Sequence, residues 1–152
     1  MPRKETVMTG ATLILMTYTI TLLLVMQVYP ADQTSVSLPT TGSIMASEGI
    51  GLYSNLACTT PKTSVEWGDL EKGGSTYVTI YIKNEGDSPL TLGLTTSDWT
   101  PSNADDYITI SWNYNNQPIN PNQVTQVTIT LSVDENAQAT DFGVNLFIVG
   151  TT

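Results

Sequence analysis

Residues 75–84 read Ser-Thr-Tyr-Val-Thr-Ile-Tyr-Ile-Lys-Asn, and apolar and polar side chains alternate along the second half of this stretch. That is the period of a β-strand, in which successive side chains point to opposite faces of a sheet. One predicted face is apolar and holds Val78, Ile80 and Ile82. The other face holds Tyr77, Thr79, Tyr81 and Lys83. The stretch therefore predicts a strand that covers a hydrophobic core on one side.

Further along the chain the same alternation recurs, each time with a row of branched or aromatic side chains. The rows are Leu90, Leu92 and Leu94; Ile108, Ile110, Trp112 and Tyr114; Val127, Ile129, Leu131 and Val133; and Phe142, Val144, Leu146 and Ile148. Residues 49–53 and 64–68 predict two shorter strands, and Gly, Pro and Asn mark the turns between the segments. No long helical period occurs in this part of the sequence. We expect an all-β fold, an antiparallel immunoglobulin-like or jelly-roll β-sandwich, over residues 43–152.

The first 31 residues predict a targeting segment that forms a hydrophobic helix. Arg3 and Lys4 precede residues 11–28, an uncharged and mostly apolar stretch, and Pro30 ends it. Its length is near the ~20 residues with which a helix spans a bilayer. We predict either a cleaved signal peptide or a retained membrane anchor. Both outcomes export the remainder of the chain to the cell surface or the medium.

Residues 38–42 read LPTTG and match the pattern that sortases cut when they attach proteins to a cell wall. A sortase signal lies near the C-terminus, before an apolar stretch and a basic tail. Here the motif follows the apolar stretch and precedes the predicted domain, so the sorting interpretation fails on position. Pro39 and Gly42 instead predict a turn between two short β segments. We assign residues 32–42 to a linker. Its composition also suits a donor strand, a segment that pairs with the sheet of another copy.

Charge and composition exclude several classes of function. The chain has 14 acidic and 5 basic residues, a net charge of −9 at pH 7, and this surface repels nucleic acid. There is no histidine, and Cys58 is the single cysteine. A Ser-His-Asp triad, a histidine-based zinc site and an intrachain disulfide are therefore ruled out.

Carboxylates are the remaining candidates for catalysis. They fall into two groups: Glu66, Asp69 and Glu71; and Asp98, Asp105 and Asp106. Both groups lie beside predicted turns, where acids commonly cap the backbone or face water. We therefore predict no catalytic residue and no enzyme activity.

Two sets of residues are candidates for ligand binding. Oxygen ligands that suit calcium are concentrated in residues 102–106 and 134–136, without EF-hand spacing. The weak calcium candidates are Asp105, Asp106, Asp134 and Glu135. Tyr77 and Tyr81 share the outward face of one predicted strand and are candidates for stacking against sugars. Apart from calcium, we expect no cofactor.

Three local patterns of turn and apolar residues stand out in the sequence. The first is a W-G-x-L-x-x-G turn, the second an I-x-N-x-G-x-x-P-L hairpin and the third a W-x-P. Their residues here are Trp67, Gly68, Leu70 and Gly73; Ile82, Asn84, Gly86, Pro89 and Leu90; and Trp99 and Pro101. These patterns resemble those of small exported β-sandwich proteins of archaea, and more distantly the chain is similar to the TasA/camelysin group and to archaeal bundling pilins. That resemblance implies jelly-roll-like subunits that join end to end by donating an N-terminal strand.

Three hypotheses follow for function. The first is a cell-surface structural subunit in which residues 34–47 pair with an exposed sheet edge of a neighbouring copy. The second is an anchored or secreted adhesion module that binds carbohydrate or calcium. The third is a type IV pilin-like subunit, which Thr9 before Gly10 and the early Pro30 disfavour. Expected partners are further copies or other surface proteins, and the membrane through residues 11–28 if these are retained.

Overall fold

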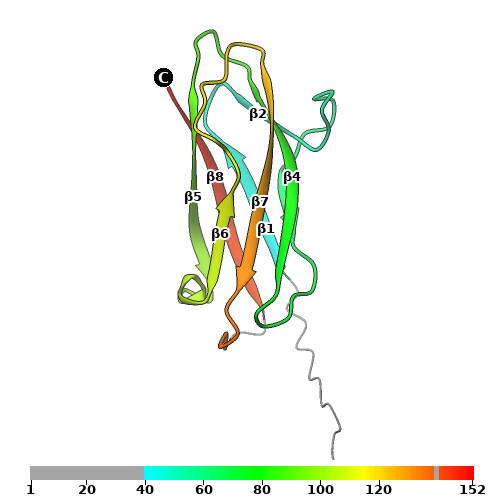
Figure 1. Ribbon diagram of the computed structural model, residues 1–152, viewed down its shortest axis with the longest axis vertical. Coiled ribbons are helices and arrows are strands. Elements are labelled where there is room, and N and C mark those ends of the chain that lie inside the picture. Colours follow the sequence, from blue (N-terminus) through cyan, green and yellow to red (C-terminus); the bar gives the residue numbers. More distant parts are fainter. Residues whose placement is uncertain (1–39, 139–140) are drawn as a thin grey trace, which may run out of the picture. The chain divides into compact units, whose positions relative to one another are not determined.

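The computed structural model describes residues 40–138 and 141–152 (Figure 1). Its strands are β1 (Thr40–Ala46), β2 (Ile50–Tyr53), β3 (Ser64–Glu66), β4 (Ser75–Asn84), β5 (Thr91–Thr100), β6 (Ile108–Trp112), β7 (Val124–Val133) and β8 (Phe142–Thr151). A short 3-10 helix, η1 (Ala104–Asp106), lies between β5 and β6. The predicted targeting helix and the first part of the predicted linker lie outside the described residues. Within the described ranges, no helix has the length and apolar content needed to cross a membrane.

Two four-stranded sheets, ordered β3-β1-β8-β5 and β2-β4-β7-β6, form a β-sandwich (Figure 1). The predicted all-β class and the two-sheet architecture are confirmed. The predicted antiparallel pairing holds except for one pair, because β1 runs parallel to β8 from Thr40↔Phe142 to Ala46↔Ile148. Short hairpins force antiparallel pairing. The first and last strands are joined by almost the whole domain, so no hairpin fixes their relative direction.

The hydrophobic core lies between the sheets and is built from the predicted alternating rows. In β7, Val127, Ile129 and Leu131 are fully buried, and in β8 Leu146 and Ile148 are as well. Burial of each such side chain contributes about 1.5–3 kcal/mol to the hydrophobic driving force for folding. The rows of β4 and β5 also point inward, whereas Ile110, Trp112 and Tyr114 are partly buried at the margin of the core.

The turn predicted at residues 39–42 is wrong for the residues that the structure describes. Thr40, Thr41 and Gly42 belong to β1, so the first strand begins before the predicted boundary at residue 43. Gly42 pairs with Val65 on one side and Val144 on the other. A Cβ atom at position 42 would lie 2.6 Å from the Val144 carbonyl oxygen. Glycine is needed here for the close approach of two strands, and not for the positive φ of a turn.

Candidate functional site

Strand β1 lies between β3 and β8 in its sheet, yet it contributes little to the hydrophobic core. Among the β1 side chains that the structure describes, only Ile44 is buried, with 2 % of its surface exposed. Strand β3 covers β1 only along Thr41–Ser43, and the Ile44 amide then donates to the Thr63 carbonyl at 3.1 Å. Beyond that point an open groove of about 420 Å³ runs beside β1 and is lined by residues 44–46 of β1, Ile50 and Leu52 of β2, and residues 61–63.

A polar network on the outer face of the sheet links β1 to β8 and, through β8, to β5. Ser43 Oγ donates to Asn145 Oδ1 at 2.5 Å, and Asn145 Nδ2 donates to Asp98 Oδ2 at 2.8 Å. Ser97 Oγ also donates to Asp98, at 2.9 Å. These hydrogen bonds, that of Asn145 first, lower the pKa of the Asp98 carboxyl below its ordinary value. The network joins β1, β8 and β5 at the bulge of β5, where Asp98 has a φ of 54°.

The connection from β1 to β2 is short and passes from one sheet to the other. The Ser47 amide donates to the Ile148 carbonyl at 2.9 Å, and Ser47 Oγ accepts from the Gly150 amide at 3.0 Å. The Ile50 amide donates to the Ser47 carbonyl at 3.2 Å. Gly49 has a φ of 80°, a conformation that glycine adopts at little cost. Residues 47–49 thus form a tight hinge at the C-terminal end of β1.

The candidate calcium residues lie in two loops that the fold brings to the same end of the sandwich. Asp105 and Asp106 are in η1, Asp134 and Glu135 follow β7, and the Asp134 amide donates to the Tyr107 carbonyl at 2.8 Å. Asp134 Oδ1 caps its own loop by accepting from the Asn136 amide at 2.7 Å. Desolvation, and then the charge of Asp106, raises the pKa of Tyr107.

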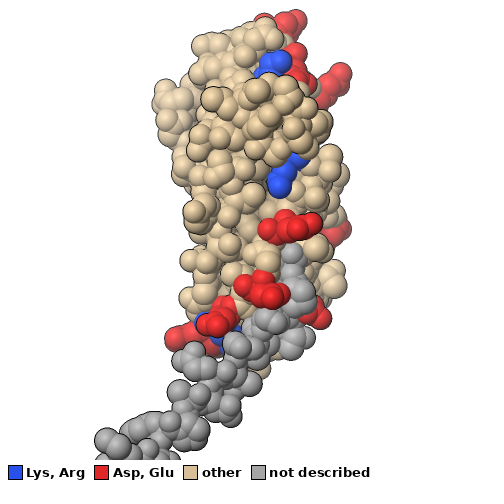
Figure 2. Space-filling view, turned by 90° about the vertical axis from the view of Figure 1, so that its right-hand side faces the viewer, with Lys and Arg blue, Asp and Glu red and all other residues tan. Residues whose placement is uncertain are grey.

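The carboxylates of these loops are not drawn into one ligand set. Within residues 40–138 and 141–152, no three Asp, Glu, His or Cys side chains are grouped so as to hold a metal ion. Figure 2 likewise shows acidic side chains in separate places along one face. Calcium binding therefore stays a prediction from composition. Of the catalytic candidates, Glu66 lies in β3 and Asp69 and Glu71 in the following loop, all three exposed.

The predicted W-G-x-L-x-x-G turn has a structural role. Trp67 and Leu70 are buried, with 4 % and 6 % of their surfaces exposed, and they close one part of the core. Gly68 and Gly73 both have a φ of 73°, which explains the requirement for glycine at these positions. In the part of the chain that the structure describes, the buried indole Nε1 of Trp67 has no hydrogen-bond partner.

The second pattern is organised by Asn84, a fully buried polar side chain at the end of β4. Its Nδ2 donates to the carbonyls of Ser88 at 2.8 Å and Ile119 at 2.9 Å, and its Oδ1 accepts from the Gly86 amide at 2.9 Å. Pro89 is exposed beside this loop. One amide therefore fixes the loop after β4 to the segment before β7.

The third pattern lies at the end of β5. Trp99 packs against Phe142 with ring centroids 6.5 Å apart, and its Nε1 donates to Thr96 Oγ1 at 3.3 Å. Pro101 follows a cis peptide bond and leads to η1. The structure places Trp99 in β5, next to the bulge.

The two predicted tyrosines lie on the outer face of the other sheet. Tyr77 is 72 % exposed, and Tyr81 is partly exposed opposite Tyr53 of β2. Tyr53 was not among the predicted residues, because its position beside Tyr81 depends on the register between β2 and β4.

A comparison with protein-family models finds no match for this chain, and a comparison with curated proteins finds none either. The resemblance to exported archaeal sandwich proteins therefore stays a prediction from local sequence patterns.

Proposed function

We propose that this chain is a non-enzymatic structural protein of the cell surface, an immunoglobulin-like or jelly-roll module whose copies join into filaments by exchanging β1. In this arrangement β1 of one copy takes the place between β3 and β8 of the next copy. The apolar segment at residues 11–28 supports export. The absence of histidine from the sequence supports a role in protein–protein contact in place of catalysis. The partner is a second copy of the same chain.

The observation that carries the proposal is how little of β1 is buried in the core. Ile44 is the one described β1 side chain that is buried, and β3 covers the strand along three positions, Thr41–Ser43. Because β1 is the first strand among the described residues, no described strand before it has to move when it leaves its sheet. A copy of β1 from a neighbour restores the same contacts, which makes exchange a low-cost route to association.

The hinge at residues 47–49 favours this exchange. Short connections between exchanging elements promote swapping, because the strand cannot fold back without a tight turn. An exchange that passes from each copy to the next, without closing into a ring, produces an open filament. The strand that leaves exposes the edge of β8 with which it pairs, and the incoming strand pairs with that edge and lies beside the groove lined by Ile50 and Leu52.

A disulfide lock tests the exchange directly. In the full chain with Cys58→Ser, the pair Ser43→Cys and Asn145→Cys links β1 to β8 of the same copy, because these residues are register partners with side chains in contact. We expect no filaments by negative-stain electron microscopy when the chain is oxidised as a dilute monomer, so that the disulfide closes within one copy, and is concentrated only afterwards. Addition of a reductant should restore them.

The matched control links two strands that do not exchange. Thr79 and Thr128 are register partners on β4 and β7, and Thr79→Cys with Thr128→Cys in the same background should leave filaments intact. Filaments that form from locked β1 would rule out exchange of this strand. Absence of filaments from the unmodified chain would instead rule out the structural function itself.

A further inference from the structure

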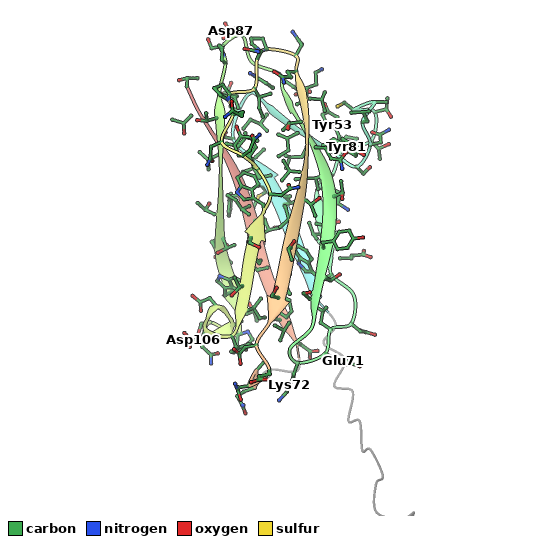
Figure 3. The ribbon with its side chains drawn as sticks, viewed as in Figure 1. Tyr53, Glu71, Lys72, Tyr81, Asp87 and Asp106 are labelled. Carbon is green, nitrogen blue, oxygen red and sulfur yellow. The ribbon has the colours of Figure 1, made fainter. Side chains whose placement is uncertain are left out.

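The outer face of the sheet β2-β4-β7-β6 carries three tyrosines that the core does not use. Tyr77 and Tyr81 project from β4, and Tyr53 of β2 lies opposite Tyr81 in the register. Figure 3 labels Tyr53 and Tyr81 near each other on the β2–β4 side of the sandwich. Among the described residues, Tyr77 is the most exposed of the large hydrophobic side chains, at 72 %. We call Tyr53, Tyr77 and Tyr81 the tyrosine face.

Tyr53 is held flat against its own strand. A Cβ atom at Gly51 would lie 2.5 Å from Cε2 of Tyr53 and 2.7 Å from Oε1 of Glu85. The ring therefore occupies the space that a side chain at position 51 would fill. Its hydroxyl donates to Glu85 Oε1 at 2.5 Å, and this hydrogen bond is the main cause of the raised pKa of Tyr53. The ring is thus fixed at both ends before any ligand arrives.

The neighbours of the tyrosine face on β4 and β7 are polar and uncharged, and charged groups lie at its edge. Thr79 separates Tyr77 from Tyr81 on β4, and the register places Gln126, Thr128 and Thr130 of β7 beside these three residues. The charged groups at its edge, Lys83 and Glu85, lie 4.0 Å apart and compensate each other. In a chain of net charge −9, this face offers hydroxyl, amide and aromatic groups in place of charge.

We propose that the tyrosine face is a binding site for neutral polysaccharide chains. Flat aromatic rings stack on the apolar C–H faces of sugar rings, while hydroxyl and amide side chains pair with sugar hydroxyls. Tyr77 and Tyr81 are four residues apart on one strand, about 13 Å, so an extended chain of several sugars spans the site. The net negative charge repels polyanions and makes neutral chains the favoured ligand.

Affinity electrophoresis of the full chain tests this site with soluble β-glucan and mannan as neutral probes and alginate as the anionic probe. We expect one or both neutral polymers to slow migration, and alginate to have no effect. Tyr81→Ala should weaken binding by about tenfold, since one stacking contact is lost. Tyr77→Ala should weaken it as well, and Tyr53→Phe should do so less, because the ring remains and only its anchor to Glu85 is lost.

Val149→Ala is the matched control, because this side chain is 41 % exposed on the outer face of the other sheet. It should leave migration in the neutral polymers unchanged. The proposal is overturned if neither neutral polymer retards the chain, if alginate retards it more, or if the variant Tyr77→Ala/Tyr81→Ala binds as the unmodified chain does. Thermal melting of each variant separates loss of binding from loss of folding. None of these outcomes depends on exchange of β1.

Discussion

Strands β1 and β7 each lie between two neighbours, yet they are held to very different degrees. Strand β7 is antiparallel to β4 and to β6 and buries Val127, Ile129, Leu131 and Val133. Strand β1 is parallel to β8, is covered by β3 along Thr41–Ser43, and buries only Ile44 among its described side chains. Pairing with a strand on each side therefore does not by itself bury a strand in the core. The buried row and the length of pairing decide which strand opens first.

The largest effect is expected at the centre of the strongly held strand. Leu131→Ala removes a side chain with no exposed surface and leaves a closed cavity between the sheets. It should lower the free energy of unfolding by about 3–4 kcal/mol. Urea denaturation followed by tryptophan fluorescence measures the change. A loss below about 1 kcal/mol would show that β7 is not the centre of the core.

Loss of the buried side chain of Asn84, at the end of β4, should have the second largest effect. Asn84→Ala leaves the carbonyls of Ser88 and Ile119 and the amide of Gly86 without their buried partner. We expect a loss of about 2–3 kcal/mol in the free energy of unfolding. The exposed Asn136→Ala is the control and should change it by less than about 0.5 kcal/mol. Equal effects of the two substitutions would contradict the role assigned to Asn84.

Ile44→Ala tests the weakly held strand with the same kind of truncation as Leu131→Ala. Ile44 lines an open groove, so the space left by its side chain is accessible to solvent and to neighbouring groups that relax into it. We expect a smaller loss, about 2 kcal/mol, at the low end for buried isoleucine. Hydrogen exchange should become faster chiefly at the amides of β1. Equal acceleration across β7 would show that the two strands open together.

Two glycines in one sheet offer a sharper test of how β1 is seated. A Cβ atom at Gly42 would lie 2.6 Å from the Val144 carbonyl oxygen, whereas one at Gly93 of β5 would lie 3.9 Å from the Val149 oxygen. Gly42→Ala should therefore push β1 from β8 and cost about 1–2 kcal/mol. Gly93→Ala should be neutral or slightly stabilising. Denaturant midpoints of the two variants give the comparison, and its reversal would refute the observed register.

The same contrast between β7 and β1 explains which parts of the fold could be predicted from the sequence. The rows of β7 and β8 were visible because their period of two is local and strong. The parallel pairing of β1 and the network of Ser43, Asn145 and Asp98 were not, because both depend on contacts between distant segments. Ile119 was not predicted as a core residue because its segment has no alternation, yet only 2 % of its surface is exposed.

The binding candidates divide in the same way. Tyr77 and Tyr81 were found from alternation within one strand. Tyr53 was missed because only the pairing of β2 with β4 places it beside Tyr81. The calcium candidates were found from composition, and the structure joins their loops without grouping three carboxylates or other ligand residues within the described ranges.

The smallest expected effect concerns the acid dependence of the attachment of β1. The pKa of Asp98 is lower in the folded chain than in the unfolded chain, because Asn145 and Ser97 donate to its charged form. Over the interval below about pH 4, the unfolded chain therefore binds more protons at this group, and stability decreases as the pH falls. Above that interval the contribution is fully present.

Asp98→Asn tests this directly, because asparagine tolerates the φ of 54° at this position and cannot lose a charge. Between pH 4 and pH 2 the variant should lose less stability than the unmodified chain, with urea midpoints measured at each pH. Asp87→Asn, at an exposed loop position, is the control for simple removal of charge. If Asp98→Asn and Asp87→Asn have the same acid profile, the network does not hold β1. If only Asp98→Asn differs, and the change in hydrogen exchange is seen at the amides of β1, the acid-sensitive network holds β1. This is the strand that we propose passes from one copy to the next.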